Sequence, residues 1–248
     1  MNKIAIGIDI GGTGIKAGLV DIVTGELLGD RVRVETPQGG HPKDIVRVTS
    51  DLIEKLGAGK DTAVGVAFPS AIQHGITLLA ANVSEKWIGF EAEKYFEAKL
   101  KRDITFVNDA DAAGFAEARY GAAKDQRGLV IMTTLGTGIG SALIYNGVLI
   151  PNAELGHLEI DGHDAEKRAS AVVREKEGLS YENWAKRLQR YYEHVEMLFT
   201  PELFIVGGGV SKSHEKFLPL LKLRTPIVPA ELFNQAGILG AAALTEHS

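Results

Sequence analysis

Three glycine-rich turns are the segments of this sequence whose residue types and spacing are best suited to chemistry. Each follows an apolar stretch, and glycine lets backbone N–H groups approach a phosphate without a side chain in the way. One such turn alone would be read as an ordinary hairpin, but three in one chain predict contacts to the phosphates of a ligand. The candidate contacts are Gly11, Gly12, Thr13, Gly14 and Lys16 in the first turn, Gly136, Thr137 and Gly138 in the second, and Gly207, Gly208 and Gly209 in the third.

The first turn offers more than backbone donors. Thr13 adds a hydroxyl group, and Lys16 would add a positive charge if it points towards the ligand. Asp9 ends the preceding apolar stretch and could hold magnesium through water, because magnesium keeps much of its hydration. The alternative is a plain turn with Asp9 and Lys16 on the surface. The pattern is neither a Walker loop, since G-x-x-x-x-G-K-[ST] is absent, nor a dinucleotide fingerprint, since a strand follows instead of a helix.

The third turn is followed by a predicted helix near Val210. A helix N-terminus at that point would suit a phosphate, or the sugar and base of a nucleotide. The stretch 210–224 then holds four basic residues against the single acid Glu215. This stretch could guide a long polyanion, and a solvated helix face explains it equally well.

Hydrophobic periodicity and glycine punctuation predict the elements that position these turns. The first and second turns align over nine positions, 12–20 on 136–144, with five identical residues and an offset of 136 − 12 = 124 residues, half of the 248-residue chain. The repeat predicts two lobes that face each other across a cleft. Strands are expected at 3–9, 15–21, 26–34, 62–68, 104–107, 129–134, 140–145, 148–150, 203–206 and 225–228, and helices at 42–56, 91–100, 164–176, 181–198 and from about 236.

Composition narrows the classes of protein. A hydrophobic content of 45% and a charged content of 24% are ordinary for a soluble globular chain. The net charge of −5 argues against a nucleic-acid-binding protein. The chain has no cysteine, which excludes disulfides, thiolate zinc sites and cysteine nucleophiles. No apolar stretch approaches the roughly 18 residues that span a membrane, and no cleavable signal precedes the first strand, so we expect a cytoplasmic protein.

With these motifs in view, the sequence resembles the ROK family of sugar kinases and repressors, and within it the short polyphosphate glucokinase branch. The resemblance implies an α/β fold of the actin/hexokinase-like (ribonuclease H-like) type, duplicated into two lobes around a central cleft. It implies a small lobe at 1–108, joined by a C-terminal helix at about 236–248, and a large lobe at 109–235. The motifs are D-I-G-G-T-G-I-K at 9–16, G-V-A-F-P-S at 65–70, V-N-D-A-D-A-A at 107–113, L-G-T-G-I-G-S-A at 135–142, N-A-E-L-G-H at 152–157 and I-V-G-G-G-V-S at 205–211.

The resemblance also implies an activity. Members of this branch phosphorylate glucose at the 6-hydroxyl with inorganic polyphosphate, in some cases also with ATP, and Mg2+ would serve as the cofactor. We therefore expect glucose and polyphosphate or ATP as partners, a homodimer, and no binding to nucleic acid or membrane. Two alternatives remain open: an ATP-dependent hexose kinase that prefers mannose or fructose, and a sugar-responsive binding protein without catalysis.

Asp109 is the candidate catalytic base. It lies between the predicted strand 104–107 and a helix that begins near Ala110, where it could take the proton of the acceptor hydroxyl. The alternative is that Asp109 or Asp111 caps the helix, as aspartate commonly does. Two aspartates allow both roles, and we assign the base to Asp109 and the cap or support to Asp111.

The expected sugar contacts combine carboxylates with an imidazole, because sugar hydroxyls need both acceptors and donors. Glu159 competes with Glu166 for one of these roles, and Trp87 is either part of the pocket or part of the core. Many family members carry a cysteine-rich zinc loop; this chain has no cysteine, so we expect no zinc and a direct sugar contact from His157. At Ser70 most relatives have glycine, and the backbone of Ser70 is still expected to face the sugar. The full set is Ser70, Asn82, Asn108, Glu154, His157 and Glu166.

Overall fold

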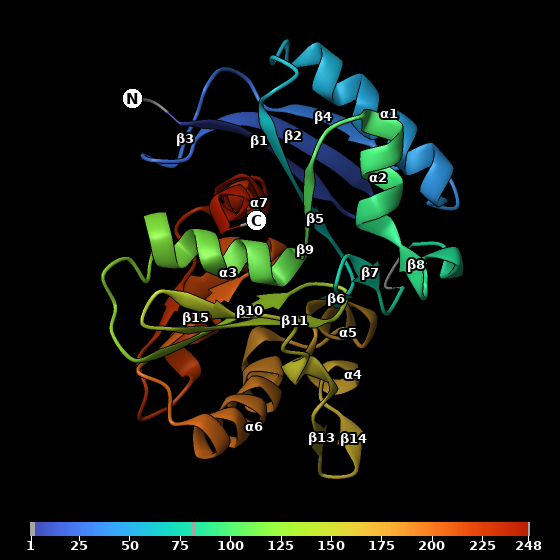
Figure 1. The fold of residues 1–248 in the computed structure, drawn as a ribbon. Helices are drawn as coiled ribbons and strands as arrows, with labels where there is room; N and C mark the ends of the chain where they lie inside the picture. The colour runs from blue at the N-terminus through green and yellow to red at the C-terminus, as the bar shows by residue number, and fades with distance from the viewer. Residues whose placement is uncertain (1–2, 81–82, 248) are drawn as a thin grey trace. The chain divides into compact units, whose positions relative to one another are not determined.

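In the computed structural model, which describes residues 3–80 and 83–247, the chain divides into two compact units (Figure 1). Unit 1 comprises Met1–Ala116 and Gln235–Ser248, and unit 2 comprises Glu117–Asn234. The division falls inside helix α3 (Asp109–Tyr120), later in the chain than the expected boundary at residue 108. Within the two described ranges, no helix combines the length and the apolar character needed to cross a bilayer.

Unit 1 is built on a mixed sheet with strand order β3-β2-β1-β5-β9, and β4 also pairs with β2. β1 and β2 form an antiparallel hairpin, whereas β5 runs parallel to both β1 and β9. The expected single strand at 26–34 is wrong, because the chain turns at Gly29 with a φ of +90° and splits it in two. The strands are β1 (Ile4–Ile10), β2 (Gly14–Asp21), β3 (Glu26–Leu27), β4 (Val32–Glu35), β5 (Ala63–Phe68) and β9 (Ile104–Asn108).

Helices α1 (Pro42–Lys55), α2 (Ala92–Leu100) and α7 (Ala236–Leu244) belong to unit 1. α1 begins with a proline at its first turn, where no backbone donor is lost, and it buries Ile45, Leu52 and Ile53. α7 packs on β1 and β5 although unit 2 separates it from them in the sequence. Gly7 of β1 permits this contact, since a Cβ there would lie 2.8 Å from the carbonyl carbon of Ile238.

A smaller three-stranded sheet in unit 1 was not expected from the sequence. It consists of β6 (Ile72–Gln73), β7 (Ile76–Thr77) and β8 (Phe90–Glu91), with the 3-10 helix Glu85–Trp87 before the last strand. Trp87 is fully buried, its ring centroid lies 4.3 Å from that of Phe68, and its indole N–H donates to the carbonyl of Gly40 over 2.8 Å. Trp87 is therefore a core residue.

Unit 2 repeats the plan of unit 1. Its sheet has the order β12-β11-β10-β15-β16, in which β10, β11 and β12 are antiparallel and β10, β15 and β16 are parallel. Each unit thus contains a hairpin, β1–β2 or β10–β11, that carries a glycine turn and is flanked by a parallel strand. The strands are β10 (Leu129–Leu135), β11 (Ile139–Tyr145), β12 (Val148–Ile150), β15 (Leu203–Gly207) and β16 (Ile227–Pro229).

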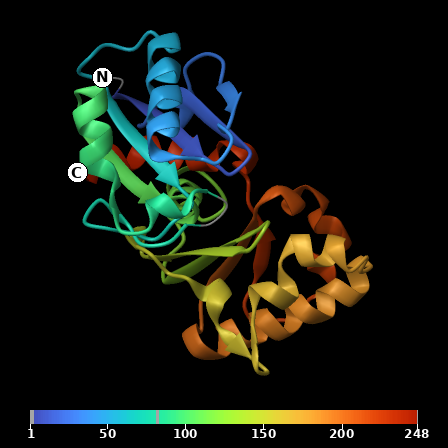
Figure 2. The same ribbon diagram turned by 90° about the vertical axis from the view of Figure 1, so that its right-hand side faces the viewer.

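Helix α6 (Tyr181–Phe199) is the long orange helix in Figure 2 and covers the unit 2 core with Trp184, Leu188 and Tyr192. The expected helix at 164–176 is wrong in its continuity. Ser170 adopts an extended conformation (φ −64°, ψ 158°) and separates α4 (Glu166–Ala169) from α5 (Ala171–Lys176). The remaining elements are the hairpin β13 (Glu159–Ile160) and β14 (His163–Asp164) and the 3-10 helices Leu155–His157, Gly209–Lys216, Leu218–Leu220, Phe233–Gln235 and Thr245–His247.

Candidate functional site

The first glycine turn joins β1 to β2 in unit 1. Gly11 N–H donates to the carbonyl of Gly14 over 3.0 Å, which closes a tight loop with Gly12 and Thr13 exposed at its tip. Lys16 lies opposite Asp9 in the strand register, and its Nζ is 2.7 Å from Asp9 Oδ2. The charge expected from Lys16 at this turn is therefore paired with Asp9 in this structure.

The carboxylate of Asp9 also lies at the start of α7. A Cβ added to Gly237, in the first turn of that helix, would be 3.0 Å from Asp9 Cγ. The N-terminal end of a helix stabilises a negative charge, so Asp9 is held by a lysine and by a helix end. Magnesium commonly takes one or two carboxylates together with waters and substrate phosphates. The half-buried carboxylate of Asp9 lies beside a glycine turn of the phosphate-binding type, so it fits the role of one such magnesium ligand. In this structure the same carboxylate also pairs with Lys16.

Arg33 is a cation at the first turn that the sequence did not reveal. It lies on β4 opposite Lys16 of β2, and a Cβ at Gly14 would meet its Nη2 at 2.9 Å. The guanidinium therefore covers the backbone of the turn while the residue stays exposed. An arginine in a predicted strand carries no sequence signal that would single it out, because the pairing of β4 with β2 is a tertiary contact.

Asn108 and Asp109 stand where β9 ends and α3 begins. Asn108 Oδ1 accepts from the N–H groups of Ala110 (2.8 Å) and Asp111 (3.0 Å), and Asp109 Oδ1 shares the Ala110 N–H at 2.8 Å. Asn108 supplies the main cap and Asp111 is buried within the first turn, so of the two roles assigned to Asp111, cap or support, the supporting role stays a prediction. The half-buried carboxylate of Asp109 is thereby fixed at the helix start.

Ser70 supports this helix start from the end of β5. Asn108 Nδ2 donates to the carbonyl of Ser70 over 3.1 Å. The Ser70 hydroxyl is buried, donates to Ala71 O (2.9 Å) and accepts from Leu79 N–H (3.0 Å). These contacts give Ser70 and Asn108 positioning roles around Asp109, and a sugar contact from either stays a prediction. Asn82 lies outside the described residues.

The second glycine turn, in unit 2, lies against Glu166. The Glu166 Oε2 atom accepts from Ile139 N–H over 3.1 Å, and a Cβ at Gly138 would meet Glu166 Cδ at 3.1 Å. Helix α4, which begins with Glu166, therefore holds its carboxylate directly on the turn. α5 is tied to the same loop, because Val172 N–H donates to the carbonyl of Gly136 over 3.1 Å.

Glu154, His157 and Glu166 form one electrostatic group, joined by Asp164. His157 Nδ1 lies 3.1 Å from Asp164 Oδ2, and this hydrogen bond is the main cause that raises the pKa of His157, with Glu166 and Glu154 adding to it. Burial is the main cause that raises the pKa of Glu154; the neighbouring Glu166 adds to it and His157 opposes it. Glu159, the competing candidate, is exposed on β13 and contributes to neither shift.

Asp164 corrects one sequence argument. His157 was expected to lack metal-binding neighbours, yet ligand atoms of His157, Asp164 and Glu166 all lie within 4.8 Å of one another. In this structure all three groups already have partners, since Asp164 and His157 bond each other and Glu166 accepts from a backbone N–H. The absence of zinc stays a prediction. The sequence could not reveal Asp164, because its contact depends on how the β13–β14 hairpin folds back.

The third glycine turn adjoins the second. Gly208 has a φ of +83°, which only glycine adopts readily, and a Cβ there would meet Leu135 N at 2.8 Å. The two turns of unit 2 are therefore in backbone contact. The helix expected after Gly209 is wrong in type: it is a 3-10 helix, and Ser213 departs from helical dihedral angles in its middle.

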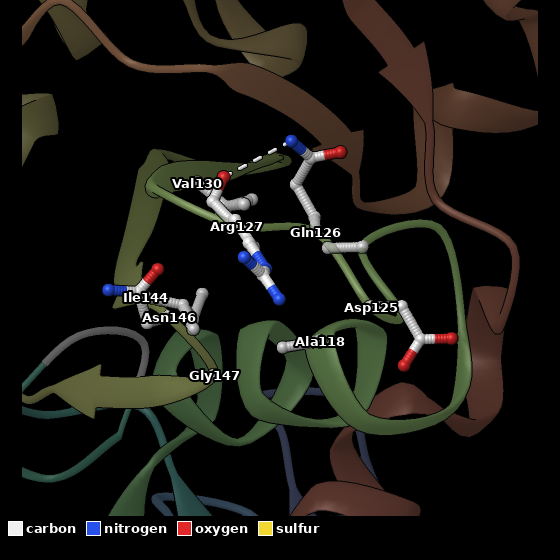
Figure 3. A pocket seen from close by; sticks show the side chains of 9 residues that line it. Ala118, Asp125, Gln126, Arg127, Val130, Ile144, Asn146 and Gly147 are labelled. Atoms are coloured by element: carbon white, nitrogen blue, oxygen red, sulfur yellow. Dashed lines mark hydrogen bonds between the residues drawn. The ribbon is translucent and has the colours of Figure 1, made fainter.

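A cavity of about 530 Å³ elsewhere in unit 2 contains none of the predicted site residues (Figure 3). The Arg127 side chain points into it, and Asn146 and Gly147 of the β11–β12 turn form part of its wall. This cavity does not coincide with the glycine turns or with the group around His157.

Comparison with known proteins finds relatives that agree on one family. The sequence profile of the ROK family matches residues 5–171. The polyphosphate glucokinase of Mycobacterium tuberculosis strain H37Rv is 49% identical over 95% of this chain and 89% of its own length. That of Mycobacterium leprae is 47% identical over 95% of this chain and 72% of its own.

Two solved structures extend the comparison. The inorganic polyphosphate/ATP-glucomannokinase of Arthrobacter sp. strain KM has a TM-score of 0.95 and 55% identity, with 99% of both chains covered. A glucokinase of Streptomyces griseus, solved with glucose and AMPPNP, has a TM-score of 0.83 over 99% of this chain and 100% of its own. At 24% identity the second likeness shows the fold alone.

Proposed function

The chain belongs to the ROK family, and on this premise we propose that it phosphorylates glucose with inorganic polyphosphate, with ATP as a second donor. The observation that carries the proposal is the 49% identity to polyphosphate glucokinases, which extends over 95% of the chain. The predicted family and the predicted actin/hexokinase-like fold are both confirmed. The division of roles between a small lobe at 1–108 with the C-terminal helix and a large lobe at 109–235 remains part of the proposal.

Asp109 acts as the base in this proposal. Phosphoryl transfer passes through a loose transition state, so the protein mainly positions groups and stabilises charge. The 6-hydroxyl of glucose gives its proton to the Asp109 carboxylate while its oxygen forms the bond to the terminal phosphorus of the donor, and the shortened donor leaves. Asn108 supports this role because its cap fixes the start of α3, and with it the carboxylate.

The donor is bound by backbone N–H groups of the three glycine turns. Lys16 and Arg33 add positive charge at the first turn. Asp9 would hold Mg2+ through water, and a bound magnesium ion would neutralise negative charge on the donor phosphates. Arg33 is supported here by its contact with the Gly14 backbone, which places a cation on the turn itself.

Glu154, His157 and Glu166 are the proposed sugar contacts in unit 2. The carboxylates of the two glutamates accept hydrogen bonds from sugar hydroxyls. The imidazole of His157 orients the sugar and donates a hydrogen bond to it. Asp164 holds His157 Nδ1 and so leaves Nε2 to face the ligand. We assign Asp164 a positioning role through this hydrogen bond.

A coupled assay for hexose 6-phosphate, with glucose and either polyphosphate or ATP, tests the function. Asp109→Asn should lower kcat about 10²–10⁴-fold, the usual contribution of a general base, while calorimetry still detects glucose binding. Asp103→Asn is the matched control, since Asp103 is exposed in the loop before β9 and the change is chemically identical. No turnover on any hexose with either donor would contradict the proposal and favour a sugar-responsive binding protein.

Mannose is the second acceptor that an observation favours. The Arthrobacter relative at 55% identity is described as a glucomannokinase, so competition between glucose and mannose should show one active site for both sugars. The homodimer, the cytoplasmic location, the requirement for Mg2+, and the lack of zinc and of nucleic-acid or membrane binding remain part of the proposal.

A further inference from the structure

A second cavity in unit 2, of about 190 Å³, lies between the β13–β14 hairpin, α4 and α6 (labelled in Figure 1). None of its lining residues belongs to the glycine turns or to the proposed sugar contacts. Its apolar part includes Ile160, Ala169 and Tyr191, and its polar part is strongly basic. The composition of this lining indicates a ligand of its own.

Four cationic side chains line this cavity against the single carboxylate of Asp161, on a protein whose net charge is −5. Two of the cations are neutralised. Arg190 forms a two-pronged pair with Asp161 (3.0 and 2.7 Å), and Arg187 pairs with Glu177 at 2.6 Å. Both carboxylates have lowered pKa values, for which these arginines are the main cause.

The other two cations, Arg168 of α4 and Lys186 of α6, form no direct ion pair with a carboxylate among residues 3–80 and 83–247. Arg168 still lies near enough to Asp161 and Glu177 to help lower the pKa of both carboxylates. Lys186 Nζ donates only to the amide oxygen of Asn183, over 3.0 Å. Both residues are exposed at the cavity. They are therefore the two cations of this lining that are not held in an ion pair.

Tyr191 provides an independent observation. It is 1% exposed and lines the cavity, and its hydroxyl is buried without a hydrogen-bond partner in the described part of the chain. Burial raises the pKa of this phenol, so it stays a neutral O–H donor. A buried hydroxyl without a partner is costly, and an acceptor oxygen could reach it only if the cavity wall opened around Tyr191 on binding.

The cavity thus offers an arginine fork and an ammonium group, both of them hydrogen-bond donors. Such a set matches a ligand with several anionic acceptor oxygens, and a phosphate group fits the arginine geometry. Drug-sized ligands occupy cavities of about 300–1,000 Å³, so about 190 Å³ suits a smaller molecule. We propose that this cavity binds a small phosphorylated anion, with a phosphate group held by Arg168 and Lys186.

The cavity lies next to one of the proposed sugar contacts, so a bound anion could affect that contact. α4 begins with Glu166, and β14 ends with Asp164. Arg168 and Ala169 lie on the same short helix as Glu166, so a bound anion would contact the helix that carries a proposed sugar contact. The inference needs only binding and does not depend on the proposed kinase activity.

Calorimetric titration of the full chain with inorganic phosphate and, separately, with glucose 6-phosphate tests the proposal. Intrinsic fluorescence gives a second readout, because Trp184 Nε1–H donates to the carbonyl of Ala169, over 2.9 Å, at the cavity wall. Arg168→Gln and Lys186→Gln should each weaken one saturable site at least tenfold. Lys167→Gln is the matched control, since Lys167 is exposed on α4 but does not line the cavity.

These variants distinguish anion binding in the cavity from anion binding at the glycine turns, because binding at the glycine turns would be unchanged in all of them. A site lost in Arg168→Gln and Lys186→Gln but kept in Lys167→Gln supports the proposal. Tighter binding of glucose 6-phosphate than of phosphate identifies a sugar phosphate as the ligand, and equal binding identifies the phosphate group alone. Equal affinities in all variants, or no saturable binding by the wild type, would overturn it. Thermal unfolding checks that each variant is folded, and no donor is present, so failure of the kinase proposal would leave this result unchanged.

Discussion

Gly7 of β1 lies against the backbone of α7, and a side chain there would have no room. In the variant Gly7→Ala the new Cβ would stand 2.8 Å from the carbonyl carbon of Ile238 and 3.0 Å from its Cγ2. Carbon atoms in favourable contact are about 3.5–4.0 Å apart, and the carbonyl oxygen of Ile238 would be nearer to the new Cβ than either carbon. Helix and strand would therefore have to separate by more than about 1 Å. Neither α7 nor β1 can move easily. Gly7 pairs with Gly18 on one side and Gly65 on the other, and Ile238 is fully buried.

Overpacking of a well-packed core costs about 1–3 kcal/mol, and the fixed backbone on both sides places Gly7→Ala near the upper end, at about 3 kcal/mol. With a urea slope of about 2 kcal/mol/M, the transition that reports unit 1 should shift down by about 1.5 M. Urea unfolding followed by circular dichroism and tryptophan fluorescence measures this shift. Gly59→Ala is the control, because its Cβ would meet Thr62 Oγ1 at 3.8 Å, an ordinary contact. If the two variants unfold within about 0.5 kcal/mol of each other, the close packing of α7 on β1 is refuted.

Three further changes test the site. Asp164→Asn removes the main cause that raises the pKa of His157. NMR titration of the imidazole should therefore show that pKa falling towards the ordinary value of about 6.5. Because the pKa of His157 is raised in the folded state, the stability lost in this variant should be largest below about pH 6.5 and vanish above the folded-state pKa. An unchanged titration would exclude the hydrogen bond. Asn108→Ala removes the acceptor of two N–H groups and should lower the free energy of unfolding by about 1–2 kcal/mol in urea; no loss would place the cap elsewhere. Arg33→Gln should raise KM for polyphosphate about fivefold, as loss of about 1 kcal/mol from an exposed charge contact implies, with KM for glucose unchanged; a change in the glucose value alone would argue against a donor contact.

Sequence periodicity predicted most of the elements because their signals are local. The apolar run before each glycine turn and the spacing of buried residues in α1 and α6 are visible within a few residues. The errors occur where the local signals favour one continuous helix or strand but contacts with distant parts of the chain interrupt it. The run at 164–176 has helical composition throughout, yet the chain breaks at Ser170 so that Glu166 and Val172 can both bond the second glycine turn.

The site was predictable to the extent that its residues lie in short motifs. Glu154, His157 and Glu166 were named from the sequence, and the structure joins them in one electrostatic group. Asp164 could not be found in this way, because it reaches His157 only through the β13–β14 hairpin. At the start of α3 the sequence pattern indicated Asp109 and Asp111 as caps and not Asn108, whose capping role is visible only in the backbone geometry.

The contact between α7 and β1 has a consequence for synthesis of the chain. Unit 2 is one continuous stretch, Glu117–Asn234, whereas unit 1 needs both ends of the polypeptide. Domains generally fold as units while a chain emerges from the ribosome. The first sheet to be made must therefore wait, with the face around Gly7 uncovered, until α7 has been made. Unit 2 can complete its own fold in the meantime, so the part of the enzyme that is translated first is the last to become native.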